Sequence, residues 1–404
     1  MNPPNTFALV VDQWFDGEQR HAQRTTMKVV DGRLEAVAAG DHGDALIGQG
    51  WPVERGAFLM PGLVDAHVHL FLDGASTDSK QRSEHLKQPL EALTDTARRS
   101  AAQALANGVT GVRDGGDRYG INHRLRDEAR SPGSALSQVR SVGLGVKRAK
   151  RYGAFMATDV GDDDSIRSSV RELARANDEI KLILTGIIDF DAGAVTDEPQ
   201  FTLEEARSVV ETAHAAGRKV MAHCSGFKGL VVAAGAGVDS IEHGFFMDRT
   251  TLALMRDKNL AWTPTFCPVH FQWASPEVAG WSAQTVGHLR RILDAHAEHL
   301  HLAHQMGVRL LVGTDAGSMG VEHGRAMFDE IDRFLEAGLP LAAVLRAATT
   351  EPRRHFGDPQ PLLAPGASFE AVQLAASPFV DVQVLRQPQR VWDAAGRRLP
   401  AAVP

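Results

Sequence analysis

The middle of the chain alternates short apolar runs with helical stretches, and this alternation restricts the fold more than any other feature. Eight apolar runs follow one another between residues 57 and 315. They read AFLMPGLVDAH, VTGVRD, QVRSVG, EIKLILTG, RKVMAHC, VDSIEH, LAWTPTF and VRLLVGTD. Strands that alternate with helices form parallel sheets from repeated βα units. Eight such units favour an α/β fold of the closed (β/α)8 TIM barrel type over an open sheet.

The stretch TLEEARSVVETAHAAG illustrates the helices between these runs. Thr202 with Glu205 three positions later predicts a capping box at the start of a helix, and Gly217 supplies a stop. The sequence shows no repeat of about 20 to 50 residues beyond the alternation itself.

The two ends of the chain have a different pattern. Residues 7–12 and 27–37 are short β-rich runs interrupted by Asp-Gly, which is typical of antiparallel hairpins. Near the other end, VQLAASP, VDVQVLRQP and QRVWDAAGRRL alternate apolar and polar residues between turns. We therefore expect the two ends to pair into one small β-sandwich. The predicted division assigns residues 1–58 and 359–404 to the sandwich and residues 59–358 to the barrel.

Composition limits the classes of partner. The 404 residues include 43 Lys and Arg against 50 Asp and Glu, a net charge of −7, so no overall positive field attracts nucleic acid or anionic lipid. Neither a basic leader with an apolar stretch nor a run of roughly 20 apolar residues is found, which predicts a cytoplasmic protein without membrane contact. A small-molecule substrate is the expected partner, and assembly into a homo-oligomer is left open. Cys224 and Cys267 are expected to be buried thiols rather than a disulfide framework.

Residues that can bind a metal recur where the apolar runs end. His67 and His69 close the first barrel strand two positions apart, so both imidazoles point to the same side. The later strands contribute Lys181, His223, His243 and Asp315. Barrel enzymes carry their chemistry at the carboxyl ends of the strands. Imidazole and carboxylate suit a divalent ion, with zinc as the first choice, although manganese, iron, nickel or cobalt can occupy similar sites.

Five segments resemble, in the right order, the successive signatures of the amidohydrolase superfamily. They are PGLVDAHVH, EIKLILTG, VMAHC, SIEHG and VGTDAG, and they are spread over nearly the whole chain. Two longer segments, FTLEEARSVVETAHAAGRKVMAHCSG and AGVDSIEHGFFMD, are most similar to one branch of that superfamily. This branch contains prolidase-like Xaa-Pro dipeptidases, Xaa-Arg or Xaa-Lys carboxypeptidase-like enzymes and imidazolonepropionase-like relatives.

The resemblance implies a binuclear metal centre. One divalent ion would be bound by His67, His69 and Asp315, the second by His223 and His243, and both by Lys181 as a carbamate formed with carbon dioxide. A hydroxide bridging the ions would attack the amide carbon, and Asp315 would pass the proton to the leaving amine. The implied catalytic residues are Asp315, Lys181 and His243. The implied substrates are N-acyl amino acids, dipeptides or related amides.

Lys181 has a second interpretation, because a lysine in an apolar strand can carry its ammonium to the barrel end or pair with a carboxylate. The carbamate is favoured, since an unmodified ammonium between two cations would repel them and a buried unpaired charge is costly.

Three further residues are candidates to bind substrate. Arg148 and Arg151 lie in VKRAKRYG, residues 146–153, directly after the third strand, where a bidentate arginine could recognise a carboxylate. A solvated loop is the alternative for this segment. His323 follows the eighth strand, and helix capping or packing explains it equally well. The histidines of HLRRILDAHAEHLHLAHQMG, His296 among them, are assigned to a solvated outer helix.

Departures from the prolidase-like pattern affect the substrate and leave two other functions open. Those relatives often carry a His after the third strand and an aromatic residue or extra His near the fifth-strand ligand, where this chain has GLGV and CSGF. Dipeptide specificity is therefore in doubt. A mononuclear cyclic-amide hydrolase or deaminase is the main alternative, but the H-x-x-E of the deaminases is missing at His223. A non-catalytic scaffold is disfavoured, because all six ligand positions are filled.

Overall fold

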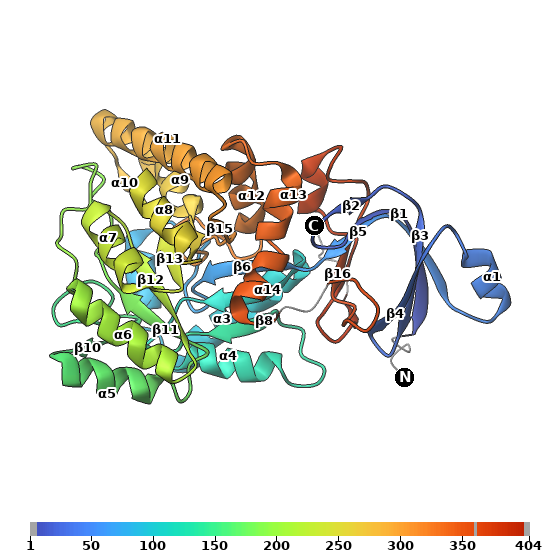
Figure 1. Cartoon of the computed structure of the whole chain (residues 1–404), viewed down its shortest axis with the longest axis horizontal. Coiled ribbons are helices and arrows are strands. Elements are labelled where there is room, and N and C mark those ends of the chain that lie inside the picture. The colour runs from blue at the N-terminus through green and yellow to red at the C-terminus, as the bar shows by residue number, and fades with distance from the viewer. Residues whose placement is uncertain (1–5, 359–361, 400–404) are drawn as a thin grey trace.

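The protein is an α/β structure with its strands in three sheets. The computed structural model describes residues 6–358 and 362–399. The middle of the chain makes two parallel sheets, and the two chain ends together make the third. In Figure 1 the helices lie outside the parallel strands, and the sheet of the chain ends stands at one side of the molecule. The predicted fold class is confirmed at this level.

The two parallel sheets contain all eight predicted barrel strands. One has the order β6-β7-β8, with strands at Leu63–Val68, Val109–Asp114 and Gln138–Ser141. The other has the order β10-β9-β11-β12-β13-β14-β15. Its strands are β9 (Gly145–Arg148), β10 (Ala157–Val160), β11 (Glu179–Ile183), β12 (Lys219–Cys224), β13 (Ser240–His243), β14 (Ala261–Thr263) and β15 (Arg309–Leu310).

Backbone hydrogen bonds link the two parallel sheets on both sides. Ala66 N donates to Val312 O at 2.9 Å, so the chain after β15 lies beside β6. Asp178 N donates to Ser141 O at 2.9 Å, so the chain just before β11 lies beside the end of β8. The carboxyl ends of these strands consequently meet at one end of the molecule.

The segment that carries Arg148 begins as a strand, where a solvated loop was one expectation. β9 pairs in parallel with β10 and β11. Val146 is buried, and Lys147 Nζ contacts a carboxylate oxygen of Asp159 at 2.5 Å. Its run of Lys and Arg residues is typical of a solvated loop. The pairing of this segment with β10 cannot be recognised from the local sequence.

Helices connect and cover the parallel strands. They are α2 (Ser79–His85), α3 (Leu90–Ala106), α4 (Ile121–Ala129), α5 (Asp163–Leu173), α6 (Leu203–Ala215), α7 (Phe227–Ala236), α8 (Arg249–Asp257), α9 (Phe266–Ala274), α10 (Pro276–Ala279), α11 (Ala283–Met306), α12 (Ala326–Glu336), α13 (Leu341–Ala347) and α14 (Thr350–Phe356). The predicted capping box of Thr202 and Glu205 opens α6, and Gly217 follows it with a φ of 69°. Cys224 and Cys267 are buried free thiols, as expected. Within the described residues, no helix combines the length and apolar character needed to cross a bilayer.

Strands from both chain ends share the third sheet, so the expected pairing of the ends is found as one sheet. Its order is β18-β17-β16-β5-β1-β3-β4, with β2 beside β1. The strands are β1 (Phe7–Phe15), β2 (Arg20–His21), β3 (Thr25–Val30), β4 (Arg33–Ala39), β5 (Val53–Pro61), β16 (Ala371–Leu374), β17 (Arg390–Trp392) and β18 (Arg398–Leu399), and α1 (Gly43–Gly48) precedes β5. Asp31 and Gly32, with φ of 48° and 74°, form the predicted hairpin turn between β3 and β4.

One strand predicted near the C-terminus is wrong. VDVQVLRQP forms a short 3-10 helix, Val382–Arg386, which begins where the Asp381 carboxylate accepts a hydrogen bond from Gln383 N at 2.9 Å. Leu385 is the only buried residue of this turn. The alternating pattern therefore reflects half-exposed positions rather than one face packed on a core.

Candidate metal centre

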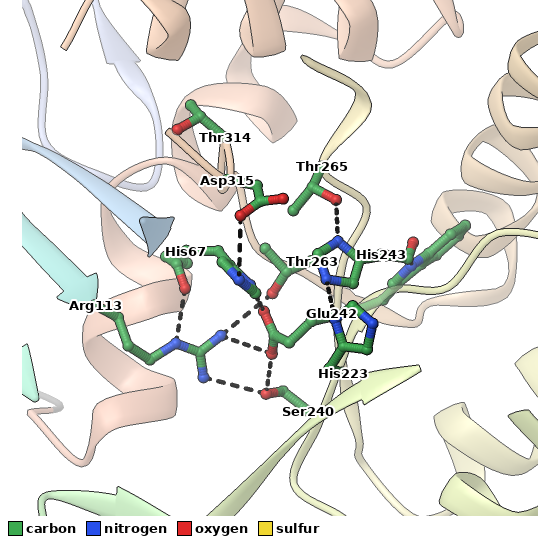
Figure 2. Close-up of polar contacts among 12 residues, drawn as sticks. His67, Arg113, His223, Ser240, Glu242, His243, Thr263, Thr265, Thr314 and Asp315 are labelled. Atoms are coloured by element: carbon green, nitrogen blue, oxygen red, sulfur yellow. Dashed lines mark hydrogen bonds and ion pairs between the residues drawn. The ribbon is translucent and has the colours of Figure 1, made fainter. Parts of the chain in front are cut away.

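The six predicted ligands come together at the carboxyl ends of the parallel strands. They come from β6 and the residue after it, from β11, from the ends of β12 and β13, and from the chain after β15: His67, His69, Lys181, His223, His243 and Asp315. Five of these side chains are buried, and Asp315 is 15% exposed. Figure 2 shows four of them facing a shared interior.

One group of three could hold a metal ion. The ligand atoms of His67, His69 and Asp315 lie within 4.8 Å of one another. Oδ1 of Asp315 lies 3.7 Å from Nε2 of His67 and 3.6 Å from Nε2 of His69. Asp315 N also donates to His67 O at 2.7 Å, which holds the two segments in register.

Three glycines allow the backbone to approach these ligands. A Cβ on Gly115 would lie 2.9 Å from Cε1 of His69 and 3.1 Å from Nε2 of His67. A Cβ on Gly313 would lie 2.9 Å from His67 N, and one on Gly317 would lie 2.5 Å from His69 O. A side chain at Gly313 or Gly317 would therefore force the segment that carries His67 and His69 to move.

His223 and His243 form a second pair of imidazoles. Nδ1 of His223 lies 2.9 Å from Nε2 of His243, and Nδ1 of His243 lies 2.7 Å from the Thr265 hydroxyl. Burial and the charge of Lys181 lower the pKa of His223 to about 3. Burial also holds the pKa of His243 well below its usual range. Both rings are therefore neutral at physiological pH, which is the form that binds a metal.

Lys181 lies among these ligands with no partner of its own. It is fully buried, and its Nζ has no hydrogen-bond partner among the described residues. A Cβ on Gly145 would lie 3.0 Å from Cβ of Lys181, so β9 leaves room for only a hydrogen atom there. Burial lowers the pKa of Lys181. Burial raises the pKa of Asp315, while the charge of Lys181 opposes that rise.

A charged network beneath the ligands was not predicted from the sequence (Figure 2). Glu242 Oε2 accepts from Nδ1 of His67 at 2.8 Å, and its Oε1 accepts from Nη2 of Arg113 at 2.8 Å. Arg113 Nη1 donates to Glu179 at 3.1 Å. These side chains are completely buried. Burial alone would raise the pKa of Glu179. The neighbouring guanidinium groups of Arg113 and Arg140 outweigh this effect and hold that pKa at about 2.

One signal in the sequence could have identified part of this network. Glu179 and Lys181 are two apart in one buried strand, so both face the same side. The same reasoning fails for Glu242 and His243, which are neighbours and would face opposite sides of a regular strand. His243 has a φ of 65°, and this departure from strand geometry lets both side chains face the interior.

The three candidate substrate-binding residues contact the protein itself. Arg148 Nη2 lies 2.5 Å from Oε1 of Glu205, and its guanidinium lies 4.8 Å from the centre of the Phe201 ring. Arg151 donates to the main-chain oxygen of Glu198. His323 is buried, and its Nε2 lies 3.2 Å from His69 O. Their part in substrate binding stays a prediction.

The assignment of His296 to a solvated helix is wrong. Its ring stacks on Phe245 with 3.8 Å between centres, and its Nε2 donates to Pro264 O at 3.0 Å. The buried positions of α11 are Thr285, Leu289, Ile292, Leu293, His296, Leu300 and Ala303, which recur at helical spacing. That apolar stripe is the signal that separates His296 from the other histidines of the helix.

Comparisons with known proteins show the family and the fold of this chain. The sequence profile of the amidohydrolase family matches residues 58–392. An uncharacterised protein of Mycobacterium tuberculosis is 29% identical over 90% of this chain and 89% of its own. The ochratoxinase of Aspergillus niger is 27% identical over 82% of this chain and 73% of its own. A solved Xaa-Pro dipeptidase with methionine in its active site has a TM-score of 0.82 at 22% identity, over 98% of this chain and 99% of that one.

Proposed function

We propose, from the premise that this chain belongs to the amidohydrolase family, that it hydrolyses an amide bond of a small substrate with two divalent metal ions. The family match bears out the resemblance in the sequence, and the fold is shared with a prolidase-like structure. N-acyl amino acids, dipeptides and related amides are the proposed substrates. The parallel strands are proposed to form the (β/α)8 barrel of residues 59–358. The terminal strands are proposed to form a sandwich of residues 1–58 and 359–404, of which residues 1–5, 359–361 and 400–404 lie outside the described part.

Two buried nitrogen atoms without hydrogen-bond partners among the described residues carry the metal proposal. They are Nζ of Lys181 and Nε2 of His67. A buried polar atom without a partner is costly, so both atoms are expected to bind something beyond the protein's own groups. Nitrogen and carboxylate donors fit zinc or a similar ion, and a carbamate on Lys181 would add an anion between two cations.

The ligands divide into two sets under this proposal. His67, His69 and Asp315 would hold one ion, His223 and His243 the other, and Lys181 as a carbamate would face both. Bound divalent ions would supply a nucleophile at neutral pH by acidifying water and would polarise the scissile carbonyl.

The side chains of this chain would carry out the proton transfers. Asp315 would take the proton of the attacking water and give it to the leaving nitrogen, because it is the one carboxylate among the six candidate ligands and is 15% exposed where the other five are buried. Oδ2 is the oxygen proposed to hold this proton, since Oδ1 faces the imidazoles of His67 and His69 while Oδ2 contacts the Ser318 hydroxyl at 3.1 Å. Glu242 would keep the proton of His67 on Nδ1 and leave Nε2 free as a donor atom.

Metal content and a substrate screen together test this function. The protein is dialysed exhaustively, its metal is measured, and a library of N-acyl amino acids and dipeptides is assayed for amine release. Two ions per chain with hydrolysis are expected. One ion with deamination or ring opening instead would establish the mononuclear alternative, and no metal with no turnover would establish a scaffold.

A further inference from the structure

A cavity of about 220 Å³ lies beside the candidate metal centre. The proposed reaction gives this cavity no role. Leu72, Leu86 and Phe155 form apolar parts of its wall. Arg82 and His85, both on α2, add polar groups. Asp73 and Ser83 complete the lining, and the exposed Asp73 carboxylate accepts from Ala75 N at 3.1 Å. The cavity therefore combines an apolar surface with one permanent cation and one exposed carboxylate.

Three contacts show that the cavity adjoins the ligands. The ring of Phe155 lies 6.4 Å from the ring of His69, measured between centres. Leu72 N donates to His69 O at 3.1 Å. Arg82 Nη2 donates to the main-chain oxygen of Gly317, two residues after Asp315. A molecule held in the cavity would thus have one end next to the site of hydrolysis.

Arg82 is held firmly by main-chain oxygens and forms no ion pair with the described residues. Burial lowers its pKa, and the nearby charges of Asp73 and Asp315 oppose that lowering. Its Nη1 donates to Asp73 O at 2.7 Å and to Ser76 O at 3.1 Å, and its Nη2 donates to Gly317 O at 2.8 Å. All three acceptors are main-chain oxygens. Among residues 6–358 and 362–399, no carboxylate lies within ion-pair distance of Arg82, and its Nε has no acceptor. The guanidinium is half-buried, so an anion placed beside it would meet little competition from water.

We propose that this cavity is a subsite for the carboxylate-bearing, apolar part of the substrate, with Arg82 as the group that binds the carboxylate. The inference rests on the proposed amide hydrolysis and names its substrate class, which is N-acylated or peptide-linked amino acids with an apolar side chain and a free carboxylate. The main-chain contacts hold the guanidinium in place before substrate arrives, which reduces the entropy lost on binding. Arg148, by contrast, already forms an ion pair with Glu205.

A pair of probes that differ only in charge tests the subsite. N-acetyl-L-phenylalanine carries the carboxylate, and N-acetyl-L-phenylalaninol replaces it with a neutral alcohol. Acetate release and equilibrium binding are measured for both compounds with the wild-type enzyme, Arg82→Gln and Arg82→Lys. Arg118→Gln is the matched control, because Arg118 is exposed and contacts Phe155 only through its main chain.

Arg82→Gln is expected to weaken binding and kcat/KM for the carboxylate by about 10- to 100-fold, the range of a charge-assisted hydrogen bond. The values for the alcohol should stay within about two-fold. Arg82→Lys should retain part of the preference for the carboxylate, and Arg118→Gln should retain all of it.

Equal losses for both probes in Arg82→Gln would overturn the subsite, since they would mean that Arg82 only supports the loop through its main-chain contacts. The subsite would also be overturned if the wild-type enzyme hydrolysed library amides without preferring those that carry a carboxylate. In that case the proposed function would stand. If no amide is hydrolysed, the proposed function fails, and the binding comparison still decides whether Arg82 holds a carboxylate.

Discussion

Glu242 accepts a hydrogen bond from Nδ1 of His67 at 2.8 Å, although the two residues are 175 positions apart in the chain. The other oxygen of the same carboxylate accepts from Arg113 at 2.8 Å. A carboxylate oxygen accepts hydrogen bonds, so the proton of the imidazole is placed on Nδ1. Nε2 of His67 therefore presents its lone pair toward Asp315.

Glu242→Gln is expected to weaken metal binding by about 10- to 100-fold, the usual effect of losing an acceptor that orients a ligand histidine. The amide keeps the size of the side chain but removes the charge that fixes the imidazole. Metal affinity is measured by competition with a chelator. Glu198→Gln, at an exposed ion pair with Lys228, is the control. Unchanged affinity in Glu242→Gln would mean that the contact only fills space.

His67→Asn and His243→Asn should each lower metal content and turnover together, because each removes an imidazole from one of the two ligand sets. Global folding should survive. Metal per chain is measured by mass spectrometry and turnover with the best library substrate. His42→Asn changes an exposed histidine in the region of the terminal sheet and should alter neither quantity. A variant at His67 or His243 with normal stoichiometry and full activity would remove that residue from the ligand set.

Asp315→Asn keeps the size of the side chain and one oxygen donor but removes the proton acceptor. Turnover is expected to fall at least ~100-fold, the lower end of general-base effects, with part of the metal retained. The melting temperature should change far less than the rate. A kcat within a few-fold of the wild type would assign Asp315 to packing alone.

Lys181→Ala should lose at least one metal ion and most of the activity. Two cations held close together in a site of low dielectric repel each other, so an anion between them matters more than the particular side chain. Acetate or propionate should restore part of the turnover by occupying the vacated space, whereas acetamide, which is neutral and similar in shape, should not. Two retained ions without rescue by either anion would contradict a bridging carbamate.

The buried carboxyl group of Glu330 should make the stability of the protein depend on pH. Its carboxyl oxygens accept from Phe266 N at 2.9 Å and Cys267 N at 3.0 Å, and burial raises its pKa from 4.5 to about 8. Between these two pH values, the folded protein keeps the proton on Glu330, whereas the unfolded chain has released it. Its contribution to the free energy of unfolding should fall as pH rises from about 4.5 to about 8 and then level off.

Glu330→Gln should flatten this dependence in urea unfolding measured from pH 5 to 9. The amide cannot titrate, so the slope due to this position disappears. Glu336→Gln, at an exposed carboxylate of the same helix, should keep the wild-type slope. An identical pH dependence in Glu330→Gln and the wild type would show that the carboxyl group titrates normally.

Local patterns were sufficient to predict eight of the parallel strands and to single out the candidate ligands, but β9 and β10 were not among the predicted strands. Period-two spacing puts His67 and His69 on one side, and the ends of apolar runs mark His223, His243 and Asp315. These features depend on backbone hydrogen bonding and burial within one segment, which a short stretch of sequence encodes. The capping box at Thr202 and the hairpin at Asp31 are predictable for the same reason.

Contacts between distant segments were decided by the tertiary structure alone. The position of Glu242 beneath His67, the burial of His296 against Phe245 and the place of Arg82 beside the cavity each depend on which strands and helices become neighbours. A charged residue looks the same in sequence whether it faces solvent or a buried partner. Its environment is set by packing, because burial makes an unpaired charge costly and a paired one acceptable only where a partner from another segment reaches it.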